Sequence, residues 1–345
     1  MKLWKKLVAI CLDFCFCLGI FTLSVKAAGS TFTVIPQASP EQMGSINQGW
    51  YLKVQPDHDY QITFQIANFL SSTNVIEVIP VIVQTNSQLQ LSLDEPNAQP
   101  GPHAQYDFRK LTTGKTLTLQ PQQRVTETIN LHVPAAGIRG ILMGGMLFRS
   151  QTDLQKQKDS LQNQGKNQSA FLSTAAISYG LYLQQSMTKL KVHLNVGAPR
   201  LRLQNQQPLL ITPVKNLTAY PFSKGRLKLQ VTNPKNHALN FTKTMNNIDL
   251  AANSQVDWLF PWQKGPLLAG KYYLKYTFTN PRMHYEFKRT LILSDKQVQE
   301  LNRYLPEKPR DYQVIFIVIA IITVCLLILL TFLVYHYGLW QKRKD

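Results

Sequence analysis

The densest group of titratable side chains in the sequence is Asp57-His58-Asp59. Aspartate and histidine are metal ligands and acid–base groups, so this group is the first place to look for catalysis. The three residues are adjacent, however, and neighbouring residues of a strand point to opposite faces, so they cannot all bind one ion. The preceding Gln55-Pro56 favours a turn. We therefore interpret the group as a polar turn that precedes a strand.

No other motif in the sequence indicates catalysis. The remaining histidines are scattered and lack the close spacing of metal-ligand pairs. The sequence has no phosphate-binding loop, no G-x-S-x-G motif and no C-x-x-C pair. These observations predict a protein that is not an enzyme and has no cofactor and no bound metal. A hydrolase with an unrecognised site is the alternative, and glycan cleavage would reveal it.

Binding is the more promising chemistry, because basic residues are concentrated in one half of the chain. Residues 29–194 contain 12 Lys and Arg against 10 Asp and Glu, whereas residues 195–311 contain 18 against 7. Such a basic domain attracts anionic polymers, for example teichoic acids or sulfated glycans. Alternatively, the lysines only keep sheet surfaces soluble. The candidate contacts are Arg200, Arg202, Lys224, Arg226, Lys228, Lys271 and Lys275.

Tryptophan side chains could add stacking contacts to sugar rings. Trp50 lies in an apolar stretch and is expected in a core. Trp258 and Trp262 belong to Trp258-Leu259-Phe260-Pro261-Trp262, which is apolar enough at alternate positions to expose one ring. A core position is the leading interpretation of both, and a binding role is the alternative.

The elements that must position these residues are strands. Residues 61–67, 125–133 and 226–232 alternate between apolar and polar side chains, which indicates strands with one buried face. Residues 75–83 are more continuously apolar, and Pro80 requires an edge, a bulge or a strand end there. The pattern predicts an all-β chain with two immunoglobulin-like β-sandwiches in tandem.

Three local features interrupt this strand pattern. Gly144-Gly145 predicts a strand in which a bulge or a close neighbouring backbone requires the absence of side chains, and a ligand-binding loop is the alternative. The segment 151–170 is rich in Gln, Asn, Lys and Ser, which predicts a flexible loop or linker. Ser294-Asp295-Lys296-Gln297 reads as a capping box that opens a short helix through Asn302.

Both ends of the chain have the composition of membrane-targeting segments. Lysines precede an apolar stretch at 7–25, and small residues near Ala27 or Ala28 suit cleavage, which is typical of a cleaved signal peptide. Asp13 within the apolar stretch leaves an uncleaved anchor as the alternative. The uncharged run 314–334 is long enough to cross a hydrocarbon core of about 30 Å as a helix. The basic tail that follows predicts a cytoplasmic C-terminus. We therefore expect a single-pass type I membrane protein whose ectodomain faces the cell wall.

The four cysteines, Cys11, Cys15, Cys17 and Cys325, all lie in these two terminal segments. The predicted ectodomain therefore contains none. Exported eukaryotic domains of this size usually carry disulfides, so their absence favours a Gram-positive bacterial surface. Nucleic acid is not an expected partner of such a domain.

The sequence resembles the WxL-interacting proteins of Gram-positive bacteria. The most specific stretch is 137–146, which begins G-x-x-G and carries the glycine pair. The other matching stretches are 32–36, 50–54, 62–68, 252–254, 268–272 and 294–302. The resemblance implies a peptidoglycan-binding first domain and a host-binding second domain. It also implies WxL-domain wall proteins as partners, and possible adhesion to host matrix components.

These inferences give one expected organisation. The first domain holds the polar segment 151–170, and the second ends in the short helix. A membrane-held chaperone for exported wall proteins is the alternative function. The ligand, the oligomeric state and the relative placement of the domains are left open. The expected segments are a signal peptide at 1–28, a first sandwich at 29–194, a basic second sandwich at 195–300, a linker at 301–313, a transmembrane helix at 314–334 and a cytoplasmic tail at 335–345.

Overall fold

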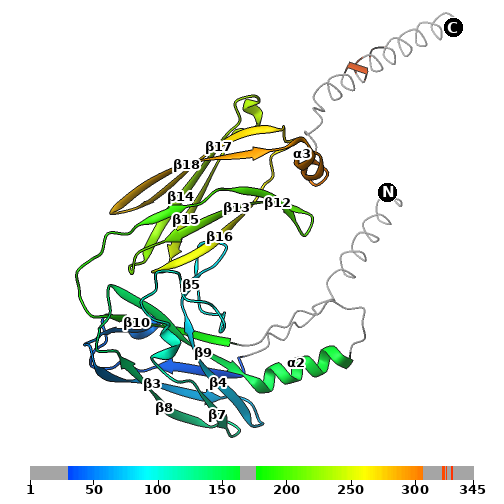
Figure 1. The fold of residues 1–345 in the computed structure, drawn as a ribbon. Helices are drawn as coiled ribbons and strands as arrows, with labels where there is room; N and C mark the ends of the chain where they lie inside the picture. The colour runs from blue at the N-terminus through cyan, green and yellow to red at the C-terminus, as the bar shows by residue number, and fades with distance from the viewer. Residues whose placement is uncertain (1–29, 164–175, 306–320, 323, 325–327, 329–345) are drawn as a thin grey trace, which may run out of the picture.

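Two β-sandwiches lie one above the other in the computed structural model (Figure 1). The structure describes residues 30–163 and 176–305, together with Ile321, Ile322, Val324 and Ile328. Strands dominate both parts, as the alternating sequence pattern predicts. The all-β, two-domain prediction is therefore confirmed.

The two predicted terminal segments lie outside this description. The leader at 1–28 is not described, and neither are residues 314–334 apart from four isolated positions. Among the described residues, no helix combines the length and the apolar character that crossing a membrane requires.

The first sandwich packs a three-stranded sheet against a five-stranded one. The smaller sheet has the order β1-β3-β8, and the larger has the order β2-β10-β9-β4-β7. Buried side chains such as Trp50, Phe64, Phe148 and Leu181 fill the space between them. The bounds are β1 Phe32–Pro36, β2 Gly49–Lys53, β3 His58–Asn68, β4 Asn74–Ile82, β7 Lys115–Leu119, β8 Arg124–Val133, β9 Ile141–Ser150 and β10 Ala176–Gln184, with short 3-10 turns at Ile46–Gln48 and Phe108–Lys110.

Apolar and polar residues alternate along β3 and β8, and the apolar residues form the buried face as predicted. Ile62, Phe64 and Ile66 are fully buried, while Thr63 and Gln65 between them are only partly buried. One pairing departs from the expected antiparallel pattern, because β2 runs parallel to β10. Strand β2 comes more than a hundred residues earlier in the sequence than β10, and such long connections allow parallel neighbours.

Pro80 lies inside β4, and the sequence predicts an edge, a bulge or a strand end at this proline. Strand β4 pairs with β9 over its full second half, but its pairing with β7 stops at Val78. Pro80 is therefore beyond the end of β7, on a stretch with only one hydrogen-bonded neighbour. Because proline lacks an N–H group, this one-sided stretch is where the sheet tolerates it.

The glycine pair lies in the middle of β9, and the predicted close approach of a neighbouring backbone is found at Gly145, whereas a side chain is the close group at Gly144. A Cβ atom on Gly144 would lie 2.1 Å from the ring of Phe108. A Cβ atom on Gly145 would lie 2.5 Å from the side chain of Leu93 and 2.7 Å from the carbonyl oxygen of Tyr179. The absence of side chains thus lets neighbouring groups pack directly on the strand.

The polar segment after β9 differs from its prediction as a flexible loop. Helix α2 spans Gln151–Asn163 and begins directly where β9 ends. Ser150 caps it, because its hydroxyl accepts a hydrogen bond from the N–H of Asp153 and donates one to Asn74. The hydroxyl of Thr152 accepts a bond from the N–H of Val75. The sequence does not predict this helix because it lacks an apolar stripe. The contacts to β4 stabilise its first turn instead.

The second sandwich has two four-stranded sheets. One contains β11, β12, β13 and β16, with β16 along the free side of β13, and the other has the order β15-β14-β17-β18. Trp258, Trp262, Tyr272, Tyr276 and Phe278 are among its buried core residues. The bounds are β11 Leu194–Val196, β12 Arg200–Gln204, β13 Gln207–Asn216, β14 Phe222–Thr232, β15 Phe241–Leu250, β16 Ser254–Pro261, β17 Gly270–Asn280 and β18 Met283–Leu293, with a 3-10 turn at His237–Leu239.

Helix α3, Asp295–Asn302, follows β18 and starts with the predicted capping box. The hydroxyl of Ser294 accepts a bond from the N–H of Gln297, and the Gln297 side chain accepts one from the N–H of Ser294. Val298 and Leu301 bury the inner side of the helix against the second core. The capping-box prediction is confirmed.

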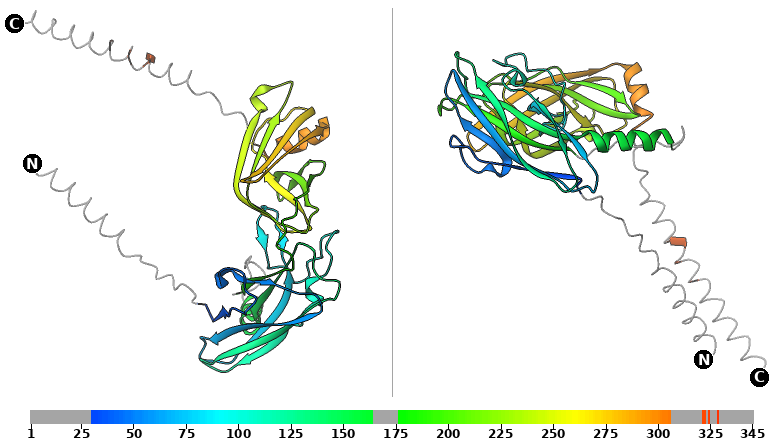
Figure 2. Two further views of the ribbon diagram at one scale, coloured as in Figure 1. Left: turned by 90° about the vertical axis from the view of Figure 1, so that its left-hand side faces the viewer. Right: turned by 90° about the horizontal axis from the view of Figure 1, so that it is seen from below.

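A hairpin from the first sandwich inserts into the second. Strands β5, Gln84–Thr85, and β6, Leu91–Ser92, form it, and it reaches the strands of the upper domain (Figure 2). Leu89 at its tip is 0% exposed and belongs to the core of the second sandwich. The N–H of Asp249 donates to the carbonyl of Leu89 over 2.9 Å. The two domains thus share part of one core.

Further contacts join the domains beside this hairpin. The N–H of Ile141 donates to the carbonyl of Ala219 over 2.8 Å, and the hydroxyls of Thr85 and Ser254 lie 2.9 Å apart. Gly101 approaches Asn253 closely, because a Cβ atom on Gly101 would lie 1.5 Å from the carbonyl oxygen of Asn253. The interface therefore depends on backbone contact as well as on apolar packing.

One ion pair in the first sandwich predicts a pH dependence of stability. Arg149 on β9 donates to Glu77 on β4 over 2.8 Å, and this hydrogen bond lowers the pKa of Glu77 below its ordinary value of 4.5. The contribution is present above that ordinary pKa and is lost as the pH falls through the lower pKa of the folded state. Urea unfolding at neutral pH and at about pH 3 should show a smaller acid-induced loss of stability for Glu77→Gln than for the unaltered protein. An equal loss in both would contradict this assignment.

Candidate functional site

The outer face of the sheet β14-β17-β18 carries the basic residues that the structure brings together. On β14, Leu227 and Leu229 are buried while Arg226 and Lys228 are exposed. The same alternation sends alternate residues of β17 and β18 outward. The cations on this surface, called here the basic face, are Arg226, Lys228, Lys271, Lys275 and Lys288.

The register of the strands places these cations in adjacent rows. Lys228 lies opposite Thr277, and Thr277 lies opposite Glu286. In the next row, Lys275 lies opposite Lys288. Successive outward residues of a strand are about 7 Å apart and neighbouring strands about 5 Å apart. Cations spaced in this way suit a ligand with repeated negative charges.

Strands β14, β17 and β18, which the structure describes completely, carry a single carboxylate among their cations. Glu286 lies 2.7 Å from the ammonium of Lys275 and 3.6 Å from the imidazole of His284. The hydrogen bond from Lys275 lowers the pKa of Glu286, so the group is ionised at neutral pH. Arg226 is held by a 2.8 Å hydrogen bond from its Nε to the amide oxygen of Asn246. These contacts orient two of the five cations.

Apolar groups adjoin the cations on the same face. Tyr273 on β17 is 49% exposed, and Ile292 on β18 is 64% exposed. Tyr273 lies between Lys271 and Lys275 along its strand, on the outward side. The face therefore offers an aromatic ring beside positive charge, which is a combination that binds charged sugars through both their rings and their anionic groups.

The remaining basic candidates lie elsewhere. Arg200 and Arg202 are exposed on β12, which belongs to the other sheet, and Arg200 is 3.4 Å from Asp257. Lys224 lies at the irregular start of β14, where its N–H donates to Asp249 over 3.0 Å. The basic face thus contains four of the seven cations that the sequence analysis gives as candidate contacts.

The proposed binding role of the tryptophans is wrong. Trp258 and Trp262 are each 1% exposed and belong to the second core. Trp258 points inward because it lies opposite the buried Thr212 of β13, and the indole N–H of Trp262 donates to the carbonyl of Lys264 over 2.7 Å. Neither ring face is available to a sugar. The leading interpretation of both residues as core residues is confirmed.

Sequence reasoning missed two members of the site, Lys288 and Tyr273. The signal for both was present as alternation along β17 and β18. Tyr272 and Tyr273 are adjacent, however, and the sequence alone does not show which ring is buried. Pairing with β18 decides this, because Tyr272 lies opposite the buried Leu291.

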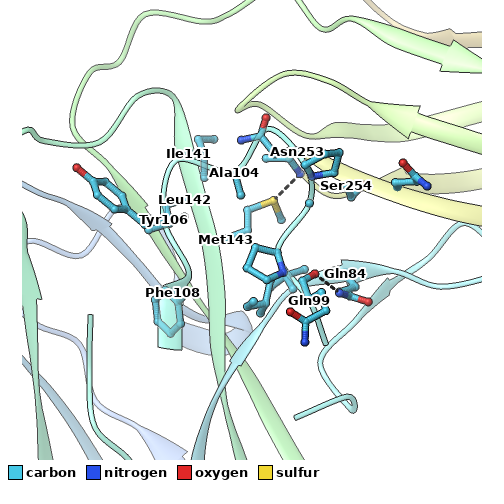
Figure 3. A pocket seen from close by; sticks show the side chains of 17 residues that line it. Gln84, Gln99, Ala104, Tyr106, Phe108, Ile141, Leu142, Met143, Asn253 and Ser254 are labelled. Carbon is cyan, nitrogen blue, oxygen red and sulfur yellow. Dashed lines mark hydrogen bonds between the residues drawn. The ribbon is translucent and has the colours of Figure 1, made fainter. Parts of the chain in front are cut away.

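A second candidate is a cavity of about 470 Å³ between the domains. Gln84, Gln99, Met143, Asn253 and Ser254 project around it, and the sulfur of Met143 accepts a 3.3 Å hydrogen bond from the N–H of Ala252 (Figure 3). Among its lining residues there is no Asp, Glu, His, Lys, Arg or Cys. The cavity thus offers mainly amide and apolar groups, together with the phenol of Tyr106.

The Asp57-His58-Asp59 group forms a turn and the start of β3. Asp57 has a positive φ of 51°, as turn residues often do. Asp59 pairs across the sheet with His132, and the Nδ1 atom of His132 lies 2.9 Å from the carboxylate of Asp59. Within the described part of the chain, no three His, Cys, Asp or Glu side chains come together as metal ligands would.

Comparison with protein families decides what kind of chain this is. Residues 32–150 match the model of the WxL Interacting Protein peptidoglycan binding domain, and residues 167–303 match that of the host binding domain. The chain is a member of the WxL Interacting Protein family. The resemblance inferred from the sequence is confirmed, including the order of the two domains. In this family member β10 lies within the host-binding match but pairs with β9 and β2 of the first sandwich.

Other comparisons add no functional information. The comparison with curated proteins gives no match. Among solved structures, the class 5 fimbriae chaperone CfaA has 8% identity and a TM-score of 0.28, covering 76% of this chain and 100% of that chain. The Pseudomonas aeruginosa CupB2 chaperone has 10% identity and a TM-score of 0.25, covering 67% and 92%. Likenesses of this strength support no argument about the family member described here.

Proposed function

We propose that this protein is a non-enzymatic binding protein of the Gram-positive cell surface. Its two immunoglobulin-like domains lie outside the cell, and the apolar run 314–334 anchors them in the membrane behind a cleaved leader. The first domain attaches to peptidoglycan, and WxL-domain wall proteins are its protein partners. The second domain binds anionic polymer of the wall or of a host matrix. The family-model names support the peptidoglycan and host components, and the terminal sequences support the anchor.

The basic face of the second domain is the observation that carries the polymer-binding part. Five cations and one carboxylate project from the three strands β14, β17 and β18. Individually, exposed ion pairs stabilise a complex by less than about 1 kcal/mol. A polymer with repeated phosphate or sulfate groups contacts several cations at once, so the weak contacts combine. Tyr273 beside these cations offers a stacking surface for a sugar ring.

On the outer surface of the sheet β1-β3-β8 in the first domain, uncharged polar groups lie between the Asp59–His132 pair and Arg124. The hydroxyls of Thr63 and Thr128 lie 3.2 Å apart across the strands, and Gln61 lies opposite Asn130. These uncharged amides and hydroxyls donate and accept hydrogen bonds, as the hydroxyl and acetamido groups of a glycan require. This surface is therefore our candidate contact for peptidoglycan.

Co-sedimentation of the purified full-length chain with isolated Gram-positive cell walls tests the proposal. The full chain is needed because Leu89 of the first domain completes the core of the second. We expect binding at low ionic strength that weakens in part as salt rises, since salt screens exposed charges but leaves neutral hydrogen bonds in place. Sedimentation that is absent at low salt would contradict the proposal.

The same preparation separates the proposed function from its alternatives. A chaperone would capture partially folded exported proteins while failing to bind mature wall. A wall hydrolase would release soluble glycan fragments during the incubation. Either result, in place of stable wall binding, would overturn the assignment as a non-enzymatic wall-binding protein.

A further inference from the structure

The second sandwich has one end that lies away from the first domain, and α3 closes it. Figure 1 shows α3 at the upper right, while the first sandwich lies at the bottom. The N–H of Leu267 donates to the amide oxygen of Asn302 on α3 over 2.7 Å, and the Asn302 amide donates to the carbonyl of Leu267 over 3.1 Å. Gly270 at the start of β17 pairs with Leu293 just before α3. The ammonium of Lys235 lies 3.7 Å from the position that a Cβ atom on Gly270 would take. These contacts join residues 233–240, 262–271 and 292–305 into one surface, called here the distal end.

Large apolar side chains are exposed at the distal end. Leu268 is 38% exposed, Ile292 is 64% exposed and Tyr304 is 43% exposed. Within the described part of residues 30–305, only seven large apolar side chains are exposed, and these are three of them. Tyr273, a fourth, lies in the row of the sheet next to Ile292. Such a concentration of exposed apolar surface indicates an interaction site.

Basic side chains surround these apolar groups. The distal end contains five Lys and Arg but only two Asp and Glu, which are Asp295 and Glu300 on α3. The cations are all exposed, and they are Lys235, Lys264, Lys271, Lys296 and Arg303. Exposed apolar groups among cations match the boundary of a lipid bilayer, where acyl chains meet anionic headgroups.

The sequence after the distal end limits how far this end can lie from a membrane. Leu305 is the last residue of the second domain that the structure describes, and the apolar run begins at Val314. Nine residues span at most about 30 Å even when fully extended. An anchored chain therefore keeps the distal end near the lipid surface, where a high effective concentration favours even a weak contact.

We propose that the distal end docks on the outer surface of the membrane that anchors the chain, with anionic phospholipid headgroups as its ligand. The inference rests on the proposed function, because it requires the anchor. Leu268, Ile292 and Tyr304 enter the interfacial region of the bilayer, while the cations around them contact phosphate groups. The apolar groups select lipid over wall polymer, because a polymer of sugars and phosphates has no apolar layer to receive Leu268 and Ile292. Docking of this end directs the first domain away from the membrane and toward the wall.

Lysine footprinting of the full-length chain in vesicles tests this inference. The chain is reconstituted into vesicles of phosphatidylglycerol or of phosphatidylcholine, and a membrane-impermeant acylating reagent modifies its exposed amines. We expect the modification of Lys235, Lys264 and Lys296 to be at least about threefold slower in the anionic vesicles, because bound headgroups cover these amines. Lys53, exposed on β2 of the first domain, should react equally in both.

Matched variants show whether docking, and not the charge of a nearby membrane alone, causes this protection. Leu268→Glu combined with Ile292→Glu places two carboxylates against the headgroups and should remove the protection. Ile35→Glu combined with Phe69→Glu makes the same change in charge at exposed apolar positions of the first domain and should keep it. All four positions are exposed, so both variants should fold.

Alkaline extraction of the same vesicles measures the anchor separately. Removal of the chain by alkali would refute the anchor and this inference together. A chain that stays in the vesicles would refute docking alone if the three lysines react equally in both lipids, or if Leu268→Glu with Ile292→Glu leaves their protection unchanged. Protection that instead requires added glycerol-phosphate polymer would assign the distal end to the wall and would also overturn the inference.

Discussion

Replacing Leu89 by alanine should lower the free energy of unfolding by about 2–5 kcal/mol, which is the range for large-to-small changes at buried leucines. The side chain is 0% exposed and comes from the first domain, yet its neighbours belong to the core of the second. The cavity that the change leaves lies between the two domains. Chemical denaturation followed by intrinsic fluorescence measures the effect, because Trp258 and Trp262 report on that core.

A matched control shows whether the effect comes from this burial. Leu268 is 38% exposed, so Leu268→Ala should change stability by less than about 0.5 kcal/mol. Hydrogen exchange adds a local measurement, since β15 and β16 flank the hairpin and should exchange faster in Leu89→Ala. If Leu89→Ala is no more destabilising than Leu268→Ala, the hairpin does not complete the second core.

Reversing two charges of the basic face should weaken polyanion binding by about thirtyfold at low salt, which corresponds to roughly 2 kcal/mol. The variant combines Arg226→Glu and Lys228→Glu on β14. Each change removes one attraction and adds one repulsion at an exposed position, so stability should change little. Isothermal titration calorimetry of the full-length chain with a glycerol-phosphate polymer measures the affinity, and the effect should shrink as salt rises.

The other sheet supplies the control for this variant. Arg200→Glu combined with Arg202→Glu makes the same change in net charge at alternate positions of β12. If net charge alone attracts the polymer, both double variants should weaken binding equally. The basic face predicts instead that the β12 variant loses less than about threefold. Equal losses would show that the row arrangement of cations has no special role.

Local sequence patterns were sufficient for much of the fold. Alternation located β3, β8 and β14, and the Ser294 capping box located the start of α3. Gly144 and Gly145 signalled a close approach, although only the structure identifies Phe108 and Leu93 as the groups that pack there. These features could be predicted because each depends on residues that are near in sequence.

Features that depend on distant residues could not be predicted. Helix α2 has a polar sequence, and its start is fixed by two hydrogen bonds with β4, one that Ser150 donates to Asn74 and one that Thr152 accepts from Val75. Leu89 lies in a short loop, where nothing marks it as a core residue of another domain. The inward direction of Trp258 follows from its pairing with Thr212 across two strands. Lys288 joins the basic face for the same reason, through its pairing with Lys275.

Lysine footprinting of the full-length chain bound to wall polymer tests the central claim most directly. An acylating reagent modifies exposed amines, and mass spectrometry measures the modification of each lysine with and without polymer. The basic face predicts that Lys228, Lys271, Lys275 and Lys288 are protected together, while Lys53 and Lys189 in exposed positions outside it are modified as before. Two results would contradict the assignment of this face as the polymer-binding surface. In one, the polymer does not change the modification of these four lysines; in the other, it protects all exposed lysines equally.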